Sequence, residues 1–365
     1  MQLSCVTKSK KWRKEMGIML NEEKKWYEKA GKESDVVIST RVRLARNLAD
    51  MPFPNRMTPD QKAAVERRVR DAILSGNSAI ASDFDFVQMD DLSNEQAVSL
   101  VERHIVSPEF IANAKGRGFL ISKDERISIM VNEEDHVRIQ VLHEGLALSE
   151  AAEMADRIDT LLNESLRFAF DSELGYLTQC PTNLGTGMRA SVMLHLPMLT
   201  RYKQMGNVNQ SVAKLGLTTR GIYGEGSEAL GDLYQVSNQV TLGRTEDEII
   251  EAVTAVGRQL IDMELSLRAR CLKEQPMDLR DALLRSYGLL RYALRMDEKE
   301  FMLHWSHLRL GAAMGLLPVS LAAADDLLTV AQDAHARRYA QESAPGEEAD
   351  AARCDIIRKT LETNV

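Results

Sequence analysis

The stretch ISIMVNEEDHVRIQV (residues 127–141) places three consecutive carboxylates, Glu133, Glu134 and Asp135, between two runs of alternating apolar and polar residues. Alternation at a two-residue period predicts extended chain on both sides of this acidic triplet. Adjacent negative charges repel one another, and partial burial adds to the cost unless a cationic or proton-donating group meets them. The stretch therefore predicts a strand whose acidic centre faces a cation.

Strand parity predicts which neighbouring side chains share a face. In the sequence STRVR, Arg41 and Arg43 are two residues apart and are therefore expected on one face. Without a bulge, the same rule places Glu134, His136 and Arg138 together. The acidic centre is thus expected to have a histidine and an arginine beside it.

Arginine also stands in two further segments with an adaptable or extended backbone. Arg189 opens RASVMLHLP after a glycine-rich loop, and Arg220 introduces the glycines of RGIYGEG. Guanidiniums that converge on one site would suit a triphosphate, because arginine binds phosphate oxygens bidentately. Taken singly, however, each arginine is more often a solvated surface residue, the acidic triplet could be a turn or a calcium-lined edge, and glycine-rich loops are common. From the residues alone, a phosphate-binding enzyme is one interpretation among these.

The rest of the chain mixes strands and helices up to about residue 272 and is expected to be helical after it. Thr58 with Gln61, and Thr245 with Glu248, have the spacing of helix capping boxes. The expected strands are 36–47, 118–122, 126–131 and 136–142, and the expected helices are 59–75, 93–105, 146–170 and 246–272. We therefore expect three parts, namely an N-terminal arm (1–34), a mixed α+β domain (35–268) and a helical C-terminal domain (269–365).

Composition excludes several classes of protein. The 365 residues carry a formal net charge of -8, which argues against a chain built mainly to bind nucleic acid. The four cysteines are scattered without metal-ligand spacing, and no apolar run approaches a membrane span, so a cytoplasmic protein is expected. The common nucleotide signatures GxxxxGK[ST], GxGxxG, HRD and DFG are missing.

Four motifs, in this order, resemble the phosphagen kinases, the ATP:guanidino phosphotransferases that include creatine and arginine kinases. They are STRVRLARN (39–47), NEEDHVRI (132–139), CPTNLGTGMRA (180–190) and RGIYGEG (220–226). Within that family, RASVMLHLP, RGIYGEGSEA and QVTLG resemble the bacterial branch that phosphorylates arginine in proteins. The resemblance implies an α+β fold of the phosphagen-kinase and glutamine-synthetase type, with a twisted antiparallel sheet flanked by helices, plus an all-helical C-terminal domain that forms dimers.

The resemblance also implies catalytic residues. Glu134 matches the carboxylate that engages the substrate guanidinium, Glu225 matches a second one, and Glu133 would act through magnesium-bound water. Cys180 matches the family's reactive cysteine near the acceptor; the alternative is a small buried thiol. Magnesium itself is expected to bind mainly through the ATP phosphates.

The arginines at 41, 43, 138, 189 and 220 match those that cradle the phosphates of ATP. The implied nucleotide-binding residues are Ser39, Thr40, Arg41, Val42, Arg43, His104, Arg138, Arg189, Ala190, Ser191, Val192, Met193, Arg220, Gly221, Ile222, Tyr223, Gly224 and Glu225.

The chain departs from the family pattern in two places. Small-substrate phosphagen kinases carry a helical domain with a closing loop ahead of the first motif, whereas 38 residues precede Ser39 here. We therefore expect an open acceptor pocket that admits an arginine of a protein. Protein arginine kinases also have an RDxxRA motif that senses phosphoarginine; this chain has ADAARC (349–354), which keeps Asp350 and Arg353. The alternative is an ordinary amphipathic last helix.

The function implied is a kinase that uses ATP and magnesium to phosphorylate arginine side chains of proteins. Its partners by resemblance would be protein substrates, a zinc-binding activator protein, a Clp-type unfoldase, a stress-response repressor and a second copy of the chain, but no nucleic acid and no membrane. Two alternatives stay open: a kinase for free arginine or another small guanidino compound, and a non-catalytic adaptor that binds phosphoarginine.

Overall fold

The computed structural model describes residues 25–28, 30–74, 80–221, 229–343 and 348–363. The chain divides into two compact units. The first unit comprises Val42–Leu142 and Ala152–Met188, together with Trp26 from the expected N-terminal arm. The second unit comprises Tyr27–Arg41, His143–Ala151 and Arg189–Val365. Most of the arm (1–24 and 29), the linker residues 344–347 and part of the last motif (222–228) lie outside the described residues.

The first unit is built on antiparallel strands in the order β2 (Phe84–Gln88), β3 (Gly118–Ser122), β4 (Ile127–Val131) and β5 (Val137–Glu144). The second half of β1 (Val37–Arg46) follows β5 in this order. The expected strands are confirmed to within two residues. Their apolar side chains pack against α3 and α4, as in the buried contact of Phe110 with Phe119. The unit's helices and remaining strands are α2 (Pro59–Leu74), α3 (Asn94–Glu102), α4 (Pro108–Ala112), most of α5 (Leu148–Ser165), β6 (Phe170–Asp171) and β7 (Gly175–Tyr176).

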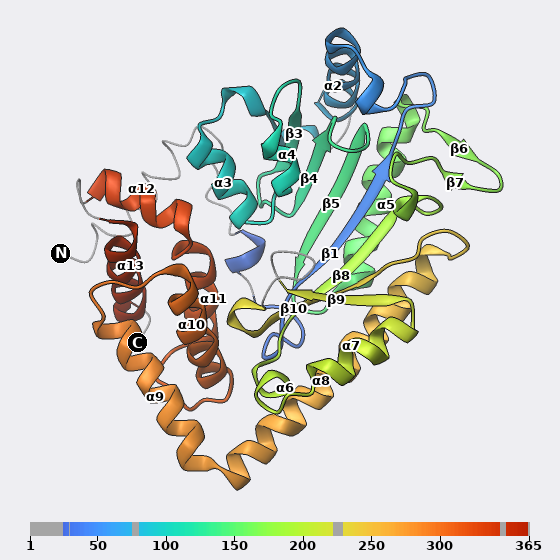
Figure 1. The fold of residues 1–365 in the computed structure, drawn as a ribbon. Helices are drawn as coiled ribbons and strands as arrows, with labels where there is room; N and C mark the ends of the chain where they lie inside the picture. The colour runs from blue at the N-terminus through green and yellow to red at the C-terminus, as the bar shows by residue number, and fades with distance from the viewer. Residues whose placement is uncertain (1–24, 29, 75–79, 222–228, 344–347, 364–365) are drawn as a thin grey trace. The chain divides into compact units, whose positions relative to one another are not determined.

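The second unit contains β8 (Met188–His195), β10 (Leu233–Asn238) and β9 (Leu217–Gly221), paired antiparallel in that order. The first half of β1 lies beside β8, because the His195 N–H donates to the Val36 carbonyl at 2.8 Å. After Asn238 the described residues contain no strand, as expected. In Figure 1 the helices that end the chain lie against one another. The unit's helices are α6 (Pro197–Arg201), α7 (Met205–Lys214), α8 (Glu246–Glu274), α9 (Pro276–Tyr292), α10 (Glu298–Ala313), α11 (Leu321–Val330), α12 (Asp333–Ser343) and α13 (Ala349–Thr363).

Local capping fixes where the predicted helices begin. Thr58 and Gln61 bond reciprocally at 2.9 and 3.3 Å ahead of α2, and Thr245 with Glu248 does the same ahead of α8. Each pair satisfies two backbone N–H groups that the first turn leaves without partners. The helix expected at 146–170 is shorter, because α5 ends at Ser165. Within the described residues, none of the helices has the length and apolarity needed to cross a membrane.

Buried arginines in the second unit join its last helices to the segment that precedes β1. Arg309 of α10, fully buried, donates to the carbonyls of Ser34 and Asp35 at 2.7 and 3.1 Å and pairs with Asp325. Arg268 of α8 donates to the same Asp35 carbonyl at 3.0 Å and pairs with Glu264. The C-terminal helices therefore supply hydrogen-bond donors to the chain just ahead of the strand that carries Arg41.

Candidate active site

The acidic triplet lies in a turn between β4 and β5, and not in a strand. Residues 132–136 form this turn, closed by a 3.0 Å hydrogen bond from the Asn132 N–H to the His136 carbonyl. Asn132 has a φ of 62°, a left-handed conformation that asparagine tolerates better than most residues. The parity prediction that grouped Glu134, His136 and Arg138 is therefore wrong, because five turn residues interrupt the two-residue period.

Asp135 and His136 anchor the turn to the rest of the first unit. Asp135 accepts hydrogen bonds from the Asn47 amide at 2.6 Å and from the Gln179 N–H at 2.8 Å. The fully buried His136 accepts from the Leu48 N–H through Nδ1 and contacts the Pro52 carbonyl through Nε2. Those partners require a neutral ring with its proton on Nε2. Burial lowers the pKa of His136, which agrees with a structural role.

Replacing Asp135 by Ala is expected to lower the free energy of unfolding by about 1–3 kcal/mol, since the Gln179 N–H and an Asn47 donor lose their acceptor. Chemical denaturation followed by circular dichroism would measure this. The matched variant Glu134→Ala removes a neighbouring carboxylate that does not hold the turn, and it should leave the free energy within about 0.5 kcal/mol. Equal stability of both variants would contradict the anchoring role.

Glu133 is neutralised inside the protein. Its carboxylate accepts a hydrogen bond from the Ser107 hydroxyl and forms an ion pair with the Arg138 guanidinium. The Glu133 side chain is 4% exposed, whereas that of Arg138 is 19% exposed. This pairing fixes the direction of a guanidinium that is predicted to bind a phosphate. Sequence reasoning missed Ser107 and Asn47, although Asn47 lies within the first motif.

Glu134 differs from both neighbours because it is only half-buried and forms no salt bridge to the described part of the chain. Burial raises the pKa of Glu134, and the negative charges of Asp135 and Glu133 raise it further. Arg138 and the nearby Cys180 thiol lower the pKa by less. Of the three carboxylates, Glu134 is the one placed to meet an incoming cation, which would relieve the repulsion.

Cys180 lies beside Glu134 in the loop that follows β7. The side chain is partly exposed, so the alternative of a buried thiol is wrong. Its sulfur is 3.0 Å from the Thr182 hydroxyl, and the thiol is close enough to Glu134 to lower the pKa of that carboxylate. The first unit thus brings together Glu133, Glu134, Arg138 and Cys180.

His104, also in the first unit, occupies a left-handed turn after α3 with a φ of 60°. Its backbone carbonyl accepts a 2.6 Å hydrogen bond from the buried Gln140 of β5. This contact holds the turn on the same strand that carries Arg138.

The predicted phosphate-binding arginines of β1, β8 and β9 are half-buried. Val42 and Leu44 are buried while Arg41 and Arg43 are partly exposed, so the predicted shared face is confirmed. Arg189 stands in the same way between buried Met188 and Ala190. Arg43 and Arg138 belong to the first unit, and Arg41, Arg189 and Arg220 belong to the second. Their convergence on one site remains a prediction.

Other residues predicted to bind nucleotide have internal roles in the second unit. Thr40 is fully buried, and its hydroxyl donates to the Gly145 carbonyl at 2.6 Å. Ser191 accepts from the Gln235 amide at 2.7 Å, and the Ala190 N–H donates to Asn238 at 2.9 Å. Four more of the predicted residues are buried, namely Ser39, Val192, Met193 and Gly221. They could contact a nucleotide only through their backbone groups. Ile222, Tyr223, Gly224 and Glu225 lie outside the described residues.

The pair predicted to sense phosphoarginine is part of the packing of α13. Arg353 is fully buried and forms ion pairs with Asp350, at 2.9 Å, and with Asp333. It also donates to the carbonyls of Met296 and Ala331 at 2.6 and 2.8 Å. The guanidinium therefore has internal partners on every nitrogen, and a sensing role for it stays a prediction.

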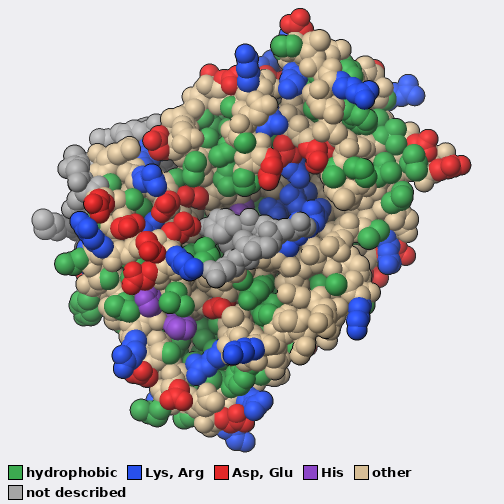
Figure 2. Space-filling model, viewed as in Figure 1, with side chains coloured by type: hydrophobic (Ala, Val, Ile, Leu, Met, Phe, Trp, Pro, Cys, Tyr) green, Lys and Arg blue, Asp and Glu red, His purple; other side chains and the backbone are tan. Residues whose placement is uncertain are grey.

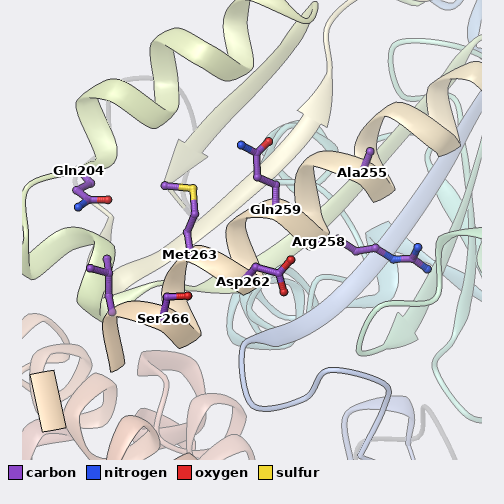
Figure 3. A pocket seen from close by; sticks show the side chains of 8 residues that line it. Gln204, Ala255, Arg258, Gln259, Asp262, Met263 and Ser266 are labelled. Carbon is purple, nitrogen blue, oxygen red and sulfur yellow. The ribbon is translucent and has the colours of Figure 1, made fainter. Parts of the chain in front are cut away.

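A separate hollow of about 590 Å³ lies along α8, away from these motifs in the sequence. Figure 3 shows Met263 and Gln259 directed to one side of the helix and Arg258 to another. Gln204, just ahead of α7, closes one end. Exposed charged and polar side chains line it, and it contains none of the predicted site residues that the structure describes.

Comparison with known proteins agrees with the fold. Residues 64–267 match the family described as ATP:guanido phosphotransferase, C-terminal catalytic domain. The chain is 26% identical to lombricine kinase, with a TM-score of 0.57 over 68% of this chain and 74% of that one. It is 29% identical to a duplicated taurocyamine kinase of Schistosoma mansoni, with a TM-score of 0.59 over 68% of this chain and 37% of that one. The chain therefore belongs to the ATP:guanido phosphotransferase family, and the predicted fold class is confirmed.

The C-terminal part of the chain shows which branch of this family the chain resembles. Residues 276–364 match the family described as Protein-arginine kinase McsB C-terminal domain. A protein-arginine kinase of Caldanaerobacter subterraneus is 45% identical over 330 residues, covering 90% of this chain and 98% of the relative. One from Brevibacillus brevis is 42% identical over 344 residues, covering 94% and 96%. The likeness thus extends through both the catalytic and the C-terminal segments.

Proposed function

We propose that this chain transfers the γ-phosphate of ATP to the guanidinium of arginine side chains in proteins. The observation that carries the proposal is Glu134, a partly exposed carboxylate with a raised pKa whose two acidic neighbours already have internal partners. Such a carboxylate still needs a cationic partner. A substrate guanidinium supplies the positive charge and two parallel N–H donors that match a carboxylate. The relatives named protein-arginine kinase support a protein rather than a free amino acid as the acceptor.

Glu134 acts mainly by aligning the acceptor nitrogen with the γ-phosphate. Full transfer of a proton from an arginine (pKa about 13.8) to an ordinary carboxylate (about 4.3) is uphill by roughly 13 kcal/mol. A turnover near 10 per second allows a total barrier of about 16 kcal/mol. Prior deprotonation would use most of that barrier, so the proton moves late, as the N–P bond forms. Because the pKa of Glu134 is raised, the difference between its pKa and that of arginine is smaller, which makes the late proton transfer less costly.

The arginines predicted to bind the ATP phosphates remain the proposed phosphate ligands, and their donor chemistry fits a triphosphate. Glu133 orients Arg138 through their ion pair and leaves its other nitrogens for a phosphate oxygen. Magnesium, carried by the ATP phosphates, would supply charge neutralisation during transfer. The Cys180 thiol lowers the pKa of the neighbouring Glu134 and thereby helps to keep that carboxylate ionised.

The test is to incubate the full chain with magnesium-ATP and β-casein, with free arginine in parallel, and to search for phosphoarginine by mass spectrometry without acid. Phosphate on protein arginine supports the proposal. Phosphate on free arginine alone would make this a small-molecule guanidino kinase. Phosphate on neither, with a zinc-binding activator protein of the family present, would favour the non-catalytic adaptor.

The wider assignments are also proposals. They are a dimer formed by the C-terminal helices, a cytoplasmic location, the activator, the Clp-type unfoldase and the stress-response repressor. Large apolar side chains exposed along α9 and just after it, including Met277, Tyr292 and Leu294, support the dimer. Acidic and basic side chains are interspersed on the face of the C-terminal helices seen in Figure 2.

A further inference from the structure

The hairpin of β6 and β7 presents apolar side chains to solvent. Phe170 is 63% exposed and Leu174 is 44% exposed, and Glu173 between them is exposed too. In Figure 1 the hairpin extends outward beside α5, and in Figure 2 acidic side chains mark its tip. A partner that covered two large apolar side chains exposed in one short hairpin would remove apolar surface from water, which is favourable.

The hairpin is held rigidly in this position. The Arg46 guanidinium lies 3.5 Å from the centre of the Tyr176 ring, and Phe170 meets the same ring edge-on at 5.2 Å. Arg46 is itself buried and paired with Asp159 at 2.9 Å. Gly175 has a φ of 72°, and its backbone is so close to Gly185 that a Cβ atom would lie 2.5 Å from the Gly185 oxygen. The exposure of Phe170 is therefore a fixed property of the fold, and a rigid surface loses little entropy when it binds a partner.

The same hairpin is connected to the candidate acceptor site within the first unit. Leu177 and Gln179 lie between β7 and Cys180 in the sequence. Gln179 is hydrogen-bonded to the acidic turn, and Leu177 is hydrogen-bonded to Asn47, which holds that turn. The Gln179 N–H donates to Asp135 at 2.8 Å, and the Leu177 carbonyl accepts from Asn47 at 3.0 Å. Phe170 and Leu174 are thus displayed on an element fixed to the turn that carries Glu134.

We propose that the β6–β7 hairpin is a docking surface for the substrate polypeptide, an inference that rests on the proposed function. Its occupant is an unfolded or extended segment in which apolar side chains flank the target arginine. Phe170 and Leu174 bind an apolar side chain of that segment, while Glu173 attracts its positive charge. The charges are complementary, because an arginine-bearing segment is cationic and the hairpin tip and acidic turn are anionic.

The experiment compares steady-state kinetics for two acceptors, β-casein and the short peptide acetyl-Gly-Arg-Gly-amide. In the double variant Phe170→Ser/Leu174→Ser, the KM for casein should rise about 10- to 100-fold, the effect of losing one buried apolar side chain at 1.5–3 kcal/mol. The kcat, the KM for ATP and the kinetics with the peptide should stay unchanged. Phe170→Leu should restore most of the casein affinity, because it keeps an apolar contact.

The matched control is Leu215→Ser/Leu242→Ser, which removes two leucines of similar exposure, 57% and 46%, from the second unit. It should leave the KM for casein unchanged. An unchanged KM in the hairpin variant, or an equal rise in the control, would overturn the docking surface while the proposed function stands. A wild-type chain that phosphorylates neither acceptor, with the zinc-binding activator protein of the family present, would overturn both.

Discussion

Replacing Glu134 by Gln is expected to lower kcat by about 10²- to 10⁴-fold while the KM for ATP stays within about twofold. The amide keeps the shape of the side chain but loses the charge that attracts and aligns the substrate guanidinium. Glu134 does not hold the turn, so folding should be unaffected. Initial rates with β-casein at saturating magnesium-ATP, together with a thermal unfolding curve, measure both effects. Glu153→Gln, an exposed carboxylate of α5 paired with Arg157, is the control and should retain full activity. Normal turnover in Glu134→Gln would remove Glu134 from the mechanism.

The pH dependence of the wild-type protein tests the same residue in another way. Burial and the nearby carboxylates raise the pKa of Glu134, and the ionised form is the active one. The kcat/KM should therefore fall, as the pH is lowered, at a higher pH than an ordinary glutamate with a pKa of 4.5 would give. An acid limb at or below that ordinary value would contradict the assignment.

Replacing Arg353 by Ala is expected to lower the free energy of unfolding by about 3–5 kcal/mol. The change removes a fully buried guanidinium, leaves the Met296 and Ala331 carbonyls and the Asp350 carboxylate without their donor, and leaves Asp333 with only the exposed Arg337. Urea denaturation followed by circular dichroism is the measurement.

The control for Arg353 is Arg337→Ala, because Arg337 pairs with the same Asp333 at 3.5 Å but is 63% exposed. A surface pair of this kind contributes about 0–1 kcal/mol. Similar losses in the two variants would show that the burial of Arg353 does not increase the free energy of unfolding. A stable Arg353→Ala protein that no longer responds to free phosphoarginine would instead favour the sensing role.

Sequence patterns predicted those parts of the structure that local rules determine. The capping boxes at Thr58 and Thr245 mark helix starts because their partners are three residues away. The strands around the acidic triplet follow from alternation. The turn between them is one of the interpretations that the sequence leaves open, since Asn132 gives little local sign of its left-handed conformation.

Local sequence rules predicted less of the candidate site. The pairs that give each carboxylate its role, Ser107 with Glu133 and Asn47 with Asp135, join residues 26 and 88 positions apart. Parity and spacing within one sequence carry no information about contacts over that distance. Only the resemblance of whole motifs predicted Glu134, and the structure supplied the reason why it differs from its neighbours.

The buried clamp of Arg309 and Arg268 on Ser34 and Asp35 has a consequence for biosynthesis. The segment ahead of β1 is made long before α10, yet the Ser34 carbonyl receives its donor only after Arg309 has been made, and the Asp35 carbonyl receives its first donor only with Arg268. The second unit therefore cannot complete its folding during the synthesis of the catalytic segment alone. Until α10 emerges, the Ser34 carbonyl lacks this buried donor, and the partly folded second unit is open to chaperones or to aggregation. A chain that stops near residue 275 would remain in that state.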